Sequence, residues 1–191
     1  MFDVLILRHH LTSFLNFYKQ EISLNLYGQI GEFTVHKSDD LIRMEFSAYK
    51  LEHIEITDMM IEALGTIPLA AYKDRDILFI LRDEDEVLDL QPDMELIPKL
   101  DGACIAVTAK GTEYNCVSRV FAPKFGIDED PVTGSTHCMI APYWSRRLNK
   151  PDITAFQASS RTGILYCECI GDKVIISGKA VLFSINDIVA L

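Results

Sequence analysis

The sequence predicts an α+β fold in which short strands surround one dominant helix. Several short segments alternate apolar and polar side chains between turn residues, a pattern typical of antiparallel strands. One longer segment repeats its apolar residues at spacings of three and four, as one face of a helix does. These residues are Cys138, Ala141, Trp144 and Leu148.

The N-terminal part of the chain is expected to form a strand meander. Alternating segments at residues 22–26, 32–36 and 42–46 read as three strands, with turn residues between them. After them, Thr57 or Asp58 can cap a short helix at 59–64 that Gly65 closes.

The middle of the chain is expected to supply the core strands. Buried strands are predicted at residues 76–81, 103–109 and 116–121. The acidic run at 82–86 is predicted to be a solvated loop, and residues 92–100 a short helix behind a proline start. The chain after residue 151 is strand-rich.

The composition restricts the partners of this protein. Its 191 residues are enough for one large domain or two small ones, and 49% of them are hydrophobic, so a packed core is expected. The net charge of −10 argues against nucleic acid or an anionic membrane surface as the main partner. No apolar run approaches the roughly 20 residues of a membrane span.

The cysteine content predicts a cytoplasmic protein. The five cysteines are odd in number and scattered along the chain, as reduced thiols of a cytosolic protein usually are. The first residues also lack the basic region and cleavage site of a secretion signal.

Residues 128–138 contain the candidate functional site. Three acids run into Pro131, and a turn of small residues precedes the predicted helix: Thr133, Gly134 and Ser135. A helix N-terminus presents N–H groups without intrahelical partners and carries partial positive charge. Gly134 lets a ligand approach the backbone, and Thr133 or Ser135 can add a hydroxyl donor. The turn is therefore suited to bind a carboxylate or phosphate.

Asp130 directly precedes this anion-binding turn. Pro131 disfavours helical backbone at Asp130 and holds it extended. A carboxylate fixed beside a bound acid group suits proton transfer. The alternative, from the residues alone, is that the Thr, Ser and Asp side chains before the helix are ordinary N-caps.

Four ordered segments carry a family resemblance. They are residues 119–123 (RVFAP), 129–135 (EDPVTGS), 141–144 (APYW) and 157–163 (QASSRTG). These segments resemble those of the phenazine-biosynthesis PhzF-like isomerase family, the last being close to its Gln-x-Ser-x-Arg-x-Gly segment. The resemblance extends from about Gly31 to the C-terminus.

The resemblance implies a diaminopimelate-epimerase-like fold. In that fold two similar β-barrel-like halves each wrap around a central helix, and the active site lies between them. Residues 1–48 would then form a partial first domain. Residues 49–191 would form the second domain, with its central helix near 135–148 and last strands that could return to the first domain.

The resemblance also implies an isomerase or epimerase that needs no metal or organic cofactor. Such an enzyme moves a proton on a small carboxylate-bearing metabolite. Asp130 matches the family's catalytic acid, and Ser135 matches the serine that helps to hold the substrate carboxylate. The further substrate-binding candidates are Thr133, Gly134, Ser159 and Arg161. A plain salt bridge is the alternative role for Arg161, and Glu129 is expected to brace the loop.

One part of the family pattern has no match in this chain. It is the N-terminal catalytic segment, with a glutamate and a Gly-His-Ala-Thr-like stretch. Two hypotheses follow: an isomerase whose site is completed by another group or a second chain, or a truncated non-catalytic remnant that folds, oligomerises and at most binds a small anion. A homodimer is expected, because an incomplete domain interface leaves apolar surface uncovered, to which residues 2–18 add more.

Overall fold

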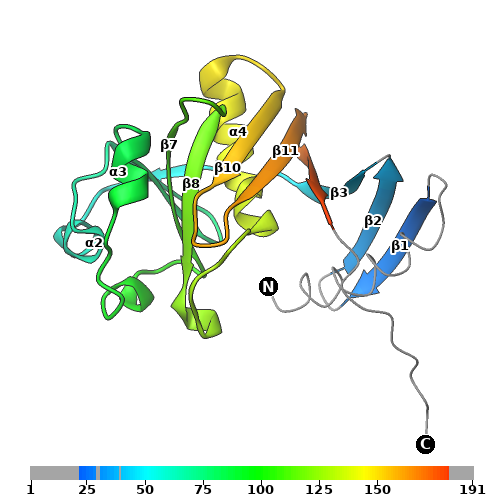
Figure 1. Cartoon of the computed structure of the whole chain (residues 1–191). Helices are drawn as coiled ribbons and strands as arrows, with labels where there is room; N and C mark the ends of the chain where they lie inside the picture. Colours follow the sequence, from blue (N-terminus) through cyan, green and yellow to red (C-terminus); the bar gives the residue numbers. More distant parts are fainter. Residues whose placement is uncertain (1–21, 29–30, 39, 181–191) are drawn as a thin grey trace, which may run out of the picture. The chain divides into compact units, whose positions relative to one another are not determined.

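The computed structural model describes residues 22–28, 31–38 and 40–180, which belong to two compact units (Figure 1). The smaller unit comprises the chain up to Glu45 and from Ser177 onward, and the larger unit comprises Phe46–Ile176. The apolar residues 2–18 lie outside the described residues.

The strands of the smaller unit form an antiparallel meander. They are β1 (Ile22–Gly28), β2 (Gly31–Ser38) and β3 (Leu41–Ser47). Leu26 pairs with Phe33 between β1 and β2, and Val35 pairs with Met44 between β2 and β3. The three strands predicted from alternation are confirmed.

The strands of the larger unit follow the order β4-β5-β6-β7-β8-β10-β11-β12, and β9 pairs with β8 beside this path. Their bounds are β4 (Glu52–Ile54), β5 (Ala70–Lys73), β6 (Ile77–Ile80), β7 (Ile105–Lys110), β8 (Cys116–Ala122), β9 (Ile127–Glu129), β10 (Asp152–Gln157), β11 (Gly163–Ile170) and β12 (Lys173–Lys179).

Two strand pairs depart from the expected antiparallel order. β6 pairs with β7, and β8 with β10, in parallel. Parallel neighbours need a long crossover connection. The crossover from β6 to β7 contains a short helix, and the crossover from β8 to β10 contains the long one.

The dominant helix, α4 (Gly134–Leu148), lies where the sequence places it. It packs against β10 and β11 (Figure 1). Every residue from 136 to 142 is buried, as is Trp144, whereas Leu148 is only half-buried. A helix that is buried on all sides is enclosed by its surroundings rather than laid on a surface. The expected inward position of Trp144 is confirmed.

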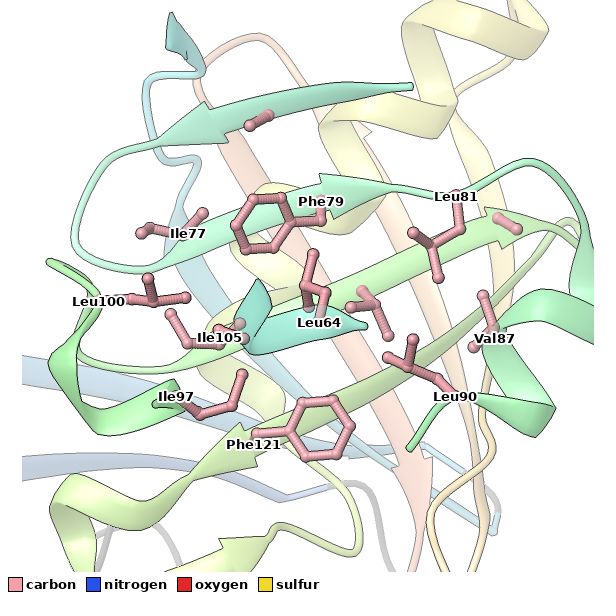
Figure 2. Close-up of a cluster of buried hydrophobic side chains, with 14 of the residues drawn as sticks. Leu64, Ile77, Phe79, Leu81, Val87, Leu90, Ile97, Leu100, Ile105 and Phe121 are labelled. Carbon is pink, nitrogen blue, oxygen red and sulfur yellow. The ribbon is translucent and has the colours of Figure 1, made fainter. Parts of the chain in front are cut away.

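A hydrophobic core lies between the sheet and three short helical segments. These are α2 (Asp58–Leu64), α3 (Glu84–Asp89) and the 3-10 turn η1 (Ile97–Lys99). Figure 2 shows Leu64 between the strand residues Phe79 and Phe121, Ile97 on the Phe121 side, and Val87 toward Leu81 and Leu90. α2 is capped by Thr57 and closed by Gly65, which has a φ of 71°, as predicted.

Residues 82–86 are exposed or half-buried, as predicted, but residues 84–86 begin helix α3, so the prediction of a loop there is wrong. Asp83 accepts a hydrogen bond from the Glu86 N–H at 2.9 Å and so caps α3, whose first turn is acidic. Acids are favourable at a helix N-terminus, and the buried Val87 anchors this helix to the core.

The short helix expected at 92–100 is reduced to η1. The Asp93 carboxylate accepts from the N–H groups of Glu95 and Leu96, and this local turn replaces the first helical turn. None of the helices in the described part of the chain is long and apolar enough to cross a membrane.

Candidate active site at the N-terminus of α4

The chain before α4 is fixed against strand β8. After β8, the 3-10 turn η2 (Pro123–Phe125) reverses the chain, and β9 pairs back onto β8. The Asp130 N–H then donates to the Val120 carbonyl at 2.9 Å. The backbone of Asp130 is thereby held by the sheet.

Gln157, at the end of β10, clamps the loop between β9 and α4. Its amide oxygen accepts from the Thr133 N–H at 2.8 Å, and its amide nitrogen donates to the Asp130 carbonyl at 2.7 Å. The same nitrogen lies 3.2 Å from the Thr133 hydroxyl oxygen. Gln157 is fully buried, so these bonds replace the water that its amide has lost.

The Thr133 hydroxyl donates its proton to the Asp130 carboxylate. Thr133 is the N-cap residue of α4, yet its side chain makes no capping bond to the helix backbone. It is also buried and accepts from Gln157. Between the two candidate hydroxyls, this geometry favours Ser135 over Thr133 as a donor to a ligand.

The first N–H groups of α4 remain available. An α-helix offers no internal acceptor to the N–H groups of Gly134 and Ser135, and no other acceptor for them occurs among the described residues. A Cβ added at Gly134 would have no heavy atom of the described chain within 4 Å, so the backbone here faces open space. These two N–H groups can therefore reach an anion.

His137 fixes the first turn of α4 from inside. Its Nδ1 lies 2.6 Å from the Thr133 carbonyl oxygen, which can only accept, so Nδ1 carries the proton. Burial lowers the pKa of His137 to about 4, although the bond to Thr133 opposes this shift. The ring is therefore neutral near pH 7.

Ser159 and Arg161 differ in their placement. Ser159 is buried, and its hydroxyl lies 3.5 Å from the Gln157 amide nitrogen, at the edge of the clamp. The Thr162 N–H donates to the Ser159 carbonyl at 2.8 Å and closes a turn. Arg161, in that turn, is exposed and forms no ion pair with any residue the structure describes.

Glu129 braces the loop, as expected. Arg119 donates to both of its carboxylate oxygens, at 2.8 and 2.9 Å. A third nitrogen of Arg119 donates to the Leu90 carbonyl at 2.6 Å. Glu129 is therefore held away from the anion-binding turn, whereas Asp130 adjoins it.

Sequence reasoning missed two residues that this site uses. One is Gln157, whose motif was visible but whose clamping role was not. The other is Arg75, whose Nη2 donates to the Ser135 hydroxyl oxygen at 2.9 Å from 60 residues earlier in the chain. No local spacing pattern could have brought Arg75 to the site.

The fold and the site together define an α+β protein with an anion-binding helix terminus beside a fixed carboxylate. The model of the phenazine biosynthesis-like protein family, PhzC-PhzF, matches residues 19–185, and the chain belongs to this family. The resemblance inferred from the sequence is thereby confirmed.

The chain is similar to named isomerases and to solved structures. It is 40% identical over 153 residues to an "uncharacterized isomerase" of Pseudomonas aeruginosa, over 80% of this chain and 59% of that relative. A phenazine biosynthesis protein of the PhzF family from Enterococcus faecalis has a similar crystal structure, with a TM-score of 0.86 and 39% identity over 92% of this chain and 68% of that chain.

A more distant similarity concerns the fold alone. A hydroxyproline epimerase from Agrobacterium vitis matches with a TM-score of 0.53 and 10% identity, over 93% of this chain and 62% of that one. The chain spans about three fifths of the length of the curated relatives it matches, 59% and 61% for two of them.

Proposed function

We propose that this protein is a PhzF-like isomerase or epimerase that moves a proton on a small carboxylate-bearing metabolite. The position of Asp130 carries the proposal. Its carboxylate is held by Thr133, and its peptide group by Gln157, immediately before the available N–H groups of α4. A substrate carboxylate bound at those N–H groups would bring its neighbouring carbon close to Asp130.

The chemistry follows from this placement. Removing a proton from the carbon beside a carboxylate moves negative charge onto the carboxylate oxygens. Fixed N–H donors and the positive end of the helix dipole stabilise that charge as it develops. Asp130 takes or returns the proton as a general base or acid. The proposed reaction needs no metal or organic cofactor.

A transfer across two faces of the carbon needs a second acid–base group. We propose that another group or a second copy of the chain supplies it. Two relatives from Pseudomonas aeruginosa are named isomerases, which supports this class of reaction. We further propose that the strands of the larger unit form a barrel-like half around α4, which the burial of every residue from 136 to 142 supports.

Exchange of carbon-bound hydrogen tests the proposal. The protein is incubated in deuterated water with a panel of small carboxylic acids, and incorporation of deuterium beside the carboxyl group is measured by mass spectrometry. Asp130→Asn keeps the shape of the side chain and removes the base, so it should abolish exchange. Anion binding should stay intact or become slightly tighter, because one repelling charge is gone.

The matched control is Asp128→Asn. Asp128 is an exposed acid two residues earlier, so its variant should exchange at the wild-type rate. Unchanged exchange in Asp130→Asn would overturn the catalytic assignment. A wild-type protein that binds carboxylates but exchanges none of them would instead be the non-catalytic remnant.

The composition of the chain also supports proposals about its partner and its compartment. We propose a homodimer in the cytoplasm, with no nucleic acid or membrane partner. The net charge of −10 supports the exclusion of nucleic acid, and five cysteines without a disulfide support a reducing compartment.

A further inference from the structure

Arg75 links the turn between β5 and β6 to the N-terminus of α4. Its Nε and Nη2 donate to the two carboxylate oxygens of Asp76, at 3.0 and 2.8 Å. Asp76 is fully buried and also accepts from the Cys104 N–H at 3.0 Å. Nη2 further donates to the Ser135 hydroxyl oxygen at 2.9 Å. The Arg75 side chain itself remains 40% exposed.

These bonds leave part of the guanidinium available. Nη1 makes no hydrogen bond to any residue in the described ranges, and the guanidinium carbon lies 5.5 Å from the centre of the Tyr49 ring. Nη1 and the engaged Nη2 share the end of the guanidinium that is turned toward Ser135. Both hydrogens of Nη2 are donated to Asp76 and Ser135, so the two N–H donors of Nη1 are the ones available to a carboxylate oxygen.

The bond from Arg75 also fixes what Ser135 can do. A guanidinium has no acceptor atom, so the Ser135 hydroxyl accepts from Arg75 and must direct its own proton elsewhere. The adjacent N–H groups of Gly134 and Ser135 lie at the same helix terminus, where a Cβ added at Gly134 would meet no described atom within 4 Å. The hydroxyl is therefore set to act as a third donor at that terminus.

Arg75 adds positive charge beside the N–H groups of the α4 terminus. The chain carries a net charge of −10. The pKa of the Cys104 thiol is affected by the charges of Asp76, Asp130 and Arg75. Burial raises the pKa of Cys104 to about 12, so this thiol adds no charge. Among the described residues that affect this thiol, Arg75 carries positive charge and offsets the two acids, which repel a carboxylate.

We propose that Arg75, held by Asp76, completes the carboxylate subsite at the N-terminus of α4. It binds one edge of the carboxylate and positions the Ser135 hydroxyl as a donor to the same group. This inference rests on the proposed function for the identity of the ligand, a small carboxylate. It adds a charged residue from outside the motif to the binding of that ligand.

Acetate binding to the wild-type protein tests the subsite without any substitution. Sodium acetate is titrated at constant ionic strength, maintained with sodium chloride, and the amide signals of Gly134 and Ser135 are followed by NMR together with the Arg75 side-chain N–H signal. We expect all three to shift with one dissociation constant. The side-chain signal of Arg147, exposed in the last turn of the same helix, should not shift. Amide shifts without a shift at Arg75, or no saturable shift at all, would refute the proposal.

Two variants give the second measurement. Arg75→Lys keeps the positive charge but loses the planar guanidinium group with its several N–H donors. The pair Arg75→Met with Asp76→Asn removes both charges, so that no buried carboxylate is left unpaired, and the Asn oxygen can still accept from the Cys104 N–H. We expect each to weaken acetate binding by roughly tenfold or more, the effect of losing a charge-assisted hydrogen bond. Arg147→Met is the matched control and should bind acetate as the wild type does.

The outcomes separate this inference from the proposed function. Folded Arg75 variants with wild-type acetate affinity show that Arg75 only braces the turn, and the inference is then wrong. Lost acetate binding in these variants, with no proton exchange by the wild type, supports the subsite and contradicts the isomerase. If the Arg75→Lys protein exchanges protons at the wild-type rate and binds acetate with the wild-type affinity, the subsite proposal is contradicted and the proposed isomerase is not.

Discussion

Thr133 holds the candidate site together at the scale of single residues. Its N–H, hydroxyl and carbonyl groups engage Gln157, Asp130 and His137 respectively. Each of these partners is fixed by a different element: β10, the loop after β9, or α4 itself. A single buried residue thus sets the direction of the Asp130 carboxylate and the start of the helix.

Gly134→Ala separates ligand binding from stability. Alanine is favoured over glycine in a helix by up to about 1 kcal/mol, and the added methyl group meets no atom of the described chain. The free energy of unfolding should therefore stay equal or rise slightly. The methyl group would stand in front of the available N–H groups, so acetate affinity should fall roughly tenfold, or ~1.4 kcal/mol.

Denaturant unfolding and an acetate titration measure the two effects. Gly178→Ala is the control, since a Cβ added there also meets nothing within 4 Å and Gly178 lies in β12 rather than in α4. If Gly134→Ala retains full acetate affinity, the helix N-terminus is not where the anion binds.

His137 predicts a specific dependence of stability on pH. Burial lowers its pKa from 6.5 to about 4 in the folded state, so the unfolded chain binds the proton more tightly. Its contribution is fully present above about pH 6.5 and is lost as the pH falls toward 4. Between about pH 7 and pH 5 the free energy of unfolding should fall on the order of 2 kcal/mol through this residue.

His137→Gln removes the titration and keeps a donor for the Thr133 carbonyl. Its stability should change less over the same pH range, as measured by denaturant unfolding at each pH. Equal slopes for the wild type and His137→Gln would show that the ring is not buried in its neutral form.

At the scale of elements, two hydrogen bonds in series link α4 to the sheet within an apolar core. The Trp144 Nε1–H donates to the Thr108 hydroxyl at 2.9 Å, and that hydroxyl donates to the Val117 carbonyl at 2.7 Å. Thr108 lies on β7 and Val117 on β8, so a single side chain of the helix connects to both strands.

Trp144→Ala should be severely destabilising. Trp144 is 5% exposed, and loss of a buried aromatic side chain costs about 3–5 kcal/mol. Circular dichroism during denaturant unfolding is the suitable measurement, because Trp144 is the only tryptophan of the chain. Trp144→Phe preserves much of the side-chain volume but loses the hydrogen bond to Thr108. It should therefore lower the free energy of unfolding clearly less than Trp144→Ala does. A loss below about 1 kcal/mol in Trp144→Ala would contradict the enclosed position of α4.

At the scale of the whole molecule, one exposed apolar row supports self-association. Ile164, Tyr166 and Ile170 lie on the same side of β11 and are 38%, 39% and 51% exposed. On the neighbouring strand Phe156 pairs with Ile164, and its ring stacks on Tyr114 at 5.2 Å. Glu168 lies between Tyr166 and Ile170 on this side of the strand, and exposed apolar side chains gathered on one face can mark an interface.

The proposed homodimer should therefore depend on this row. Sedimentation velocity over a dilution series should show a dimer at micromolar concentration for the wild type. Ile164→Thr with Ile170→Thr keeps β-branched residues on the strand but removes apolar area, and should shift the equilibrium toward the monomer. Ile67→Thr with Leu69→Thr alters two exposed apolar residues outside this row and should have no effect. A wild-type protein that stays monomeric at all concentrations contradicts the dimer.

The sequence by itself determined the elements whose signals are local. The three-and-four spacing around Trp144 located α4, and alternation located the three strands of the meander. The small residues before α4 indicated an anion-binding terminus, because a helix N-terminus always presents unpaired N–H groups. The family was also readable from short ordered segments, and the match over residues 19–185 confirmed it.

Only the tertiary structure decided which distant residues meet at that terminus. Gln157 reaches Thr133 from 24 residues away, and Arg75 reaches Ser135 from 60. The capped helix α3 and the two parallel strand pairs were missed for a related reason. An acidic run becomes a helix when a residue such as Val87 finds a core to enter, and strand direction depends on the path of the crossover. Local spacing reports the geometry of neighbours along the chain, whereas contacts across it depend on how the elements pack.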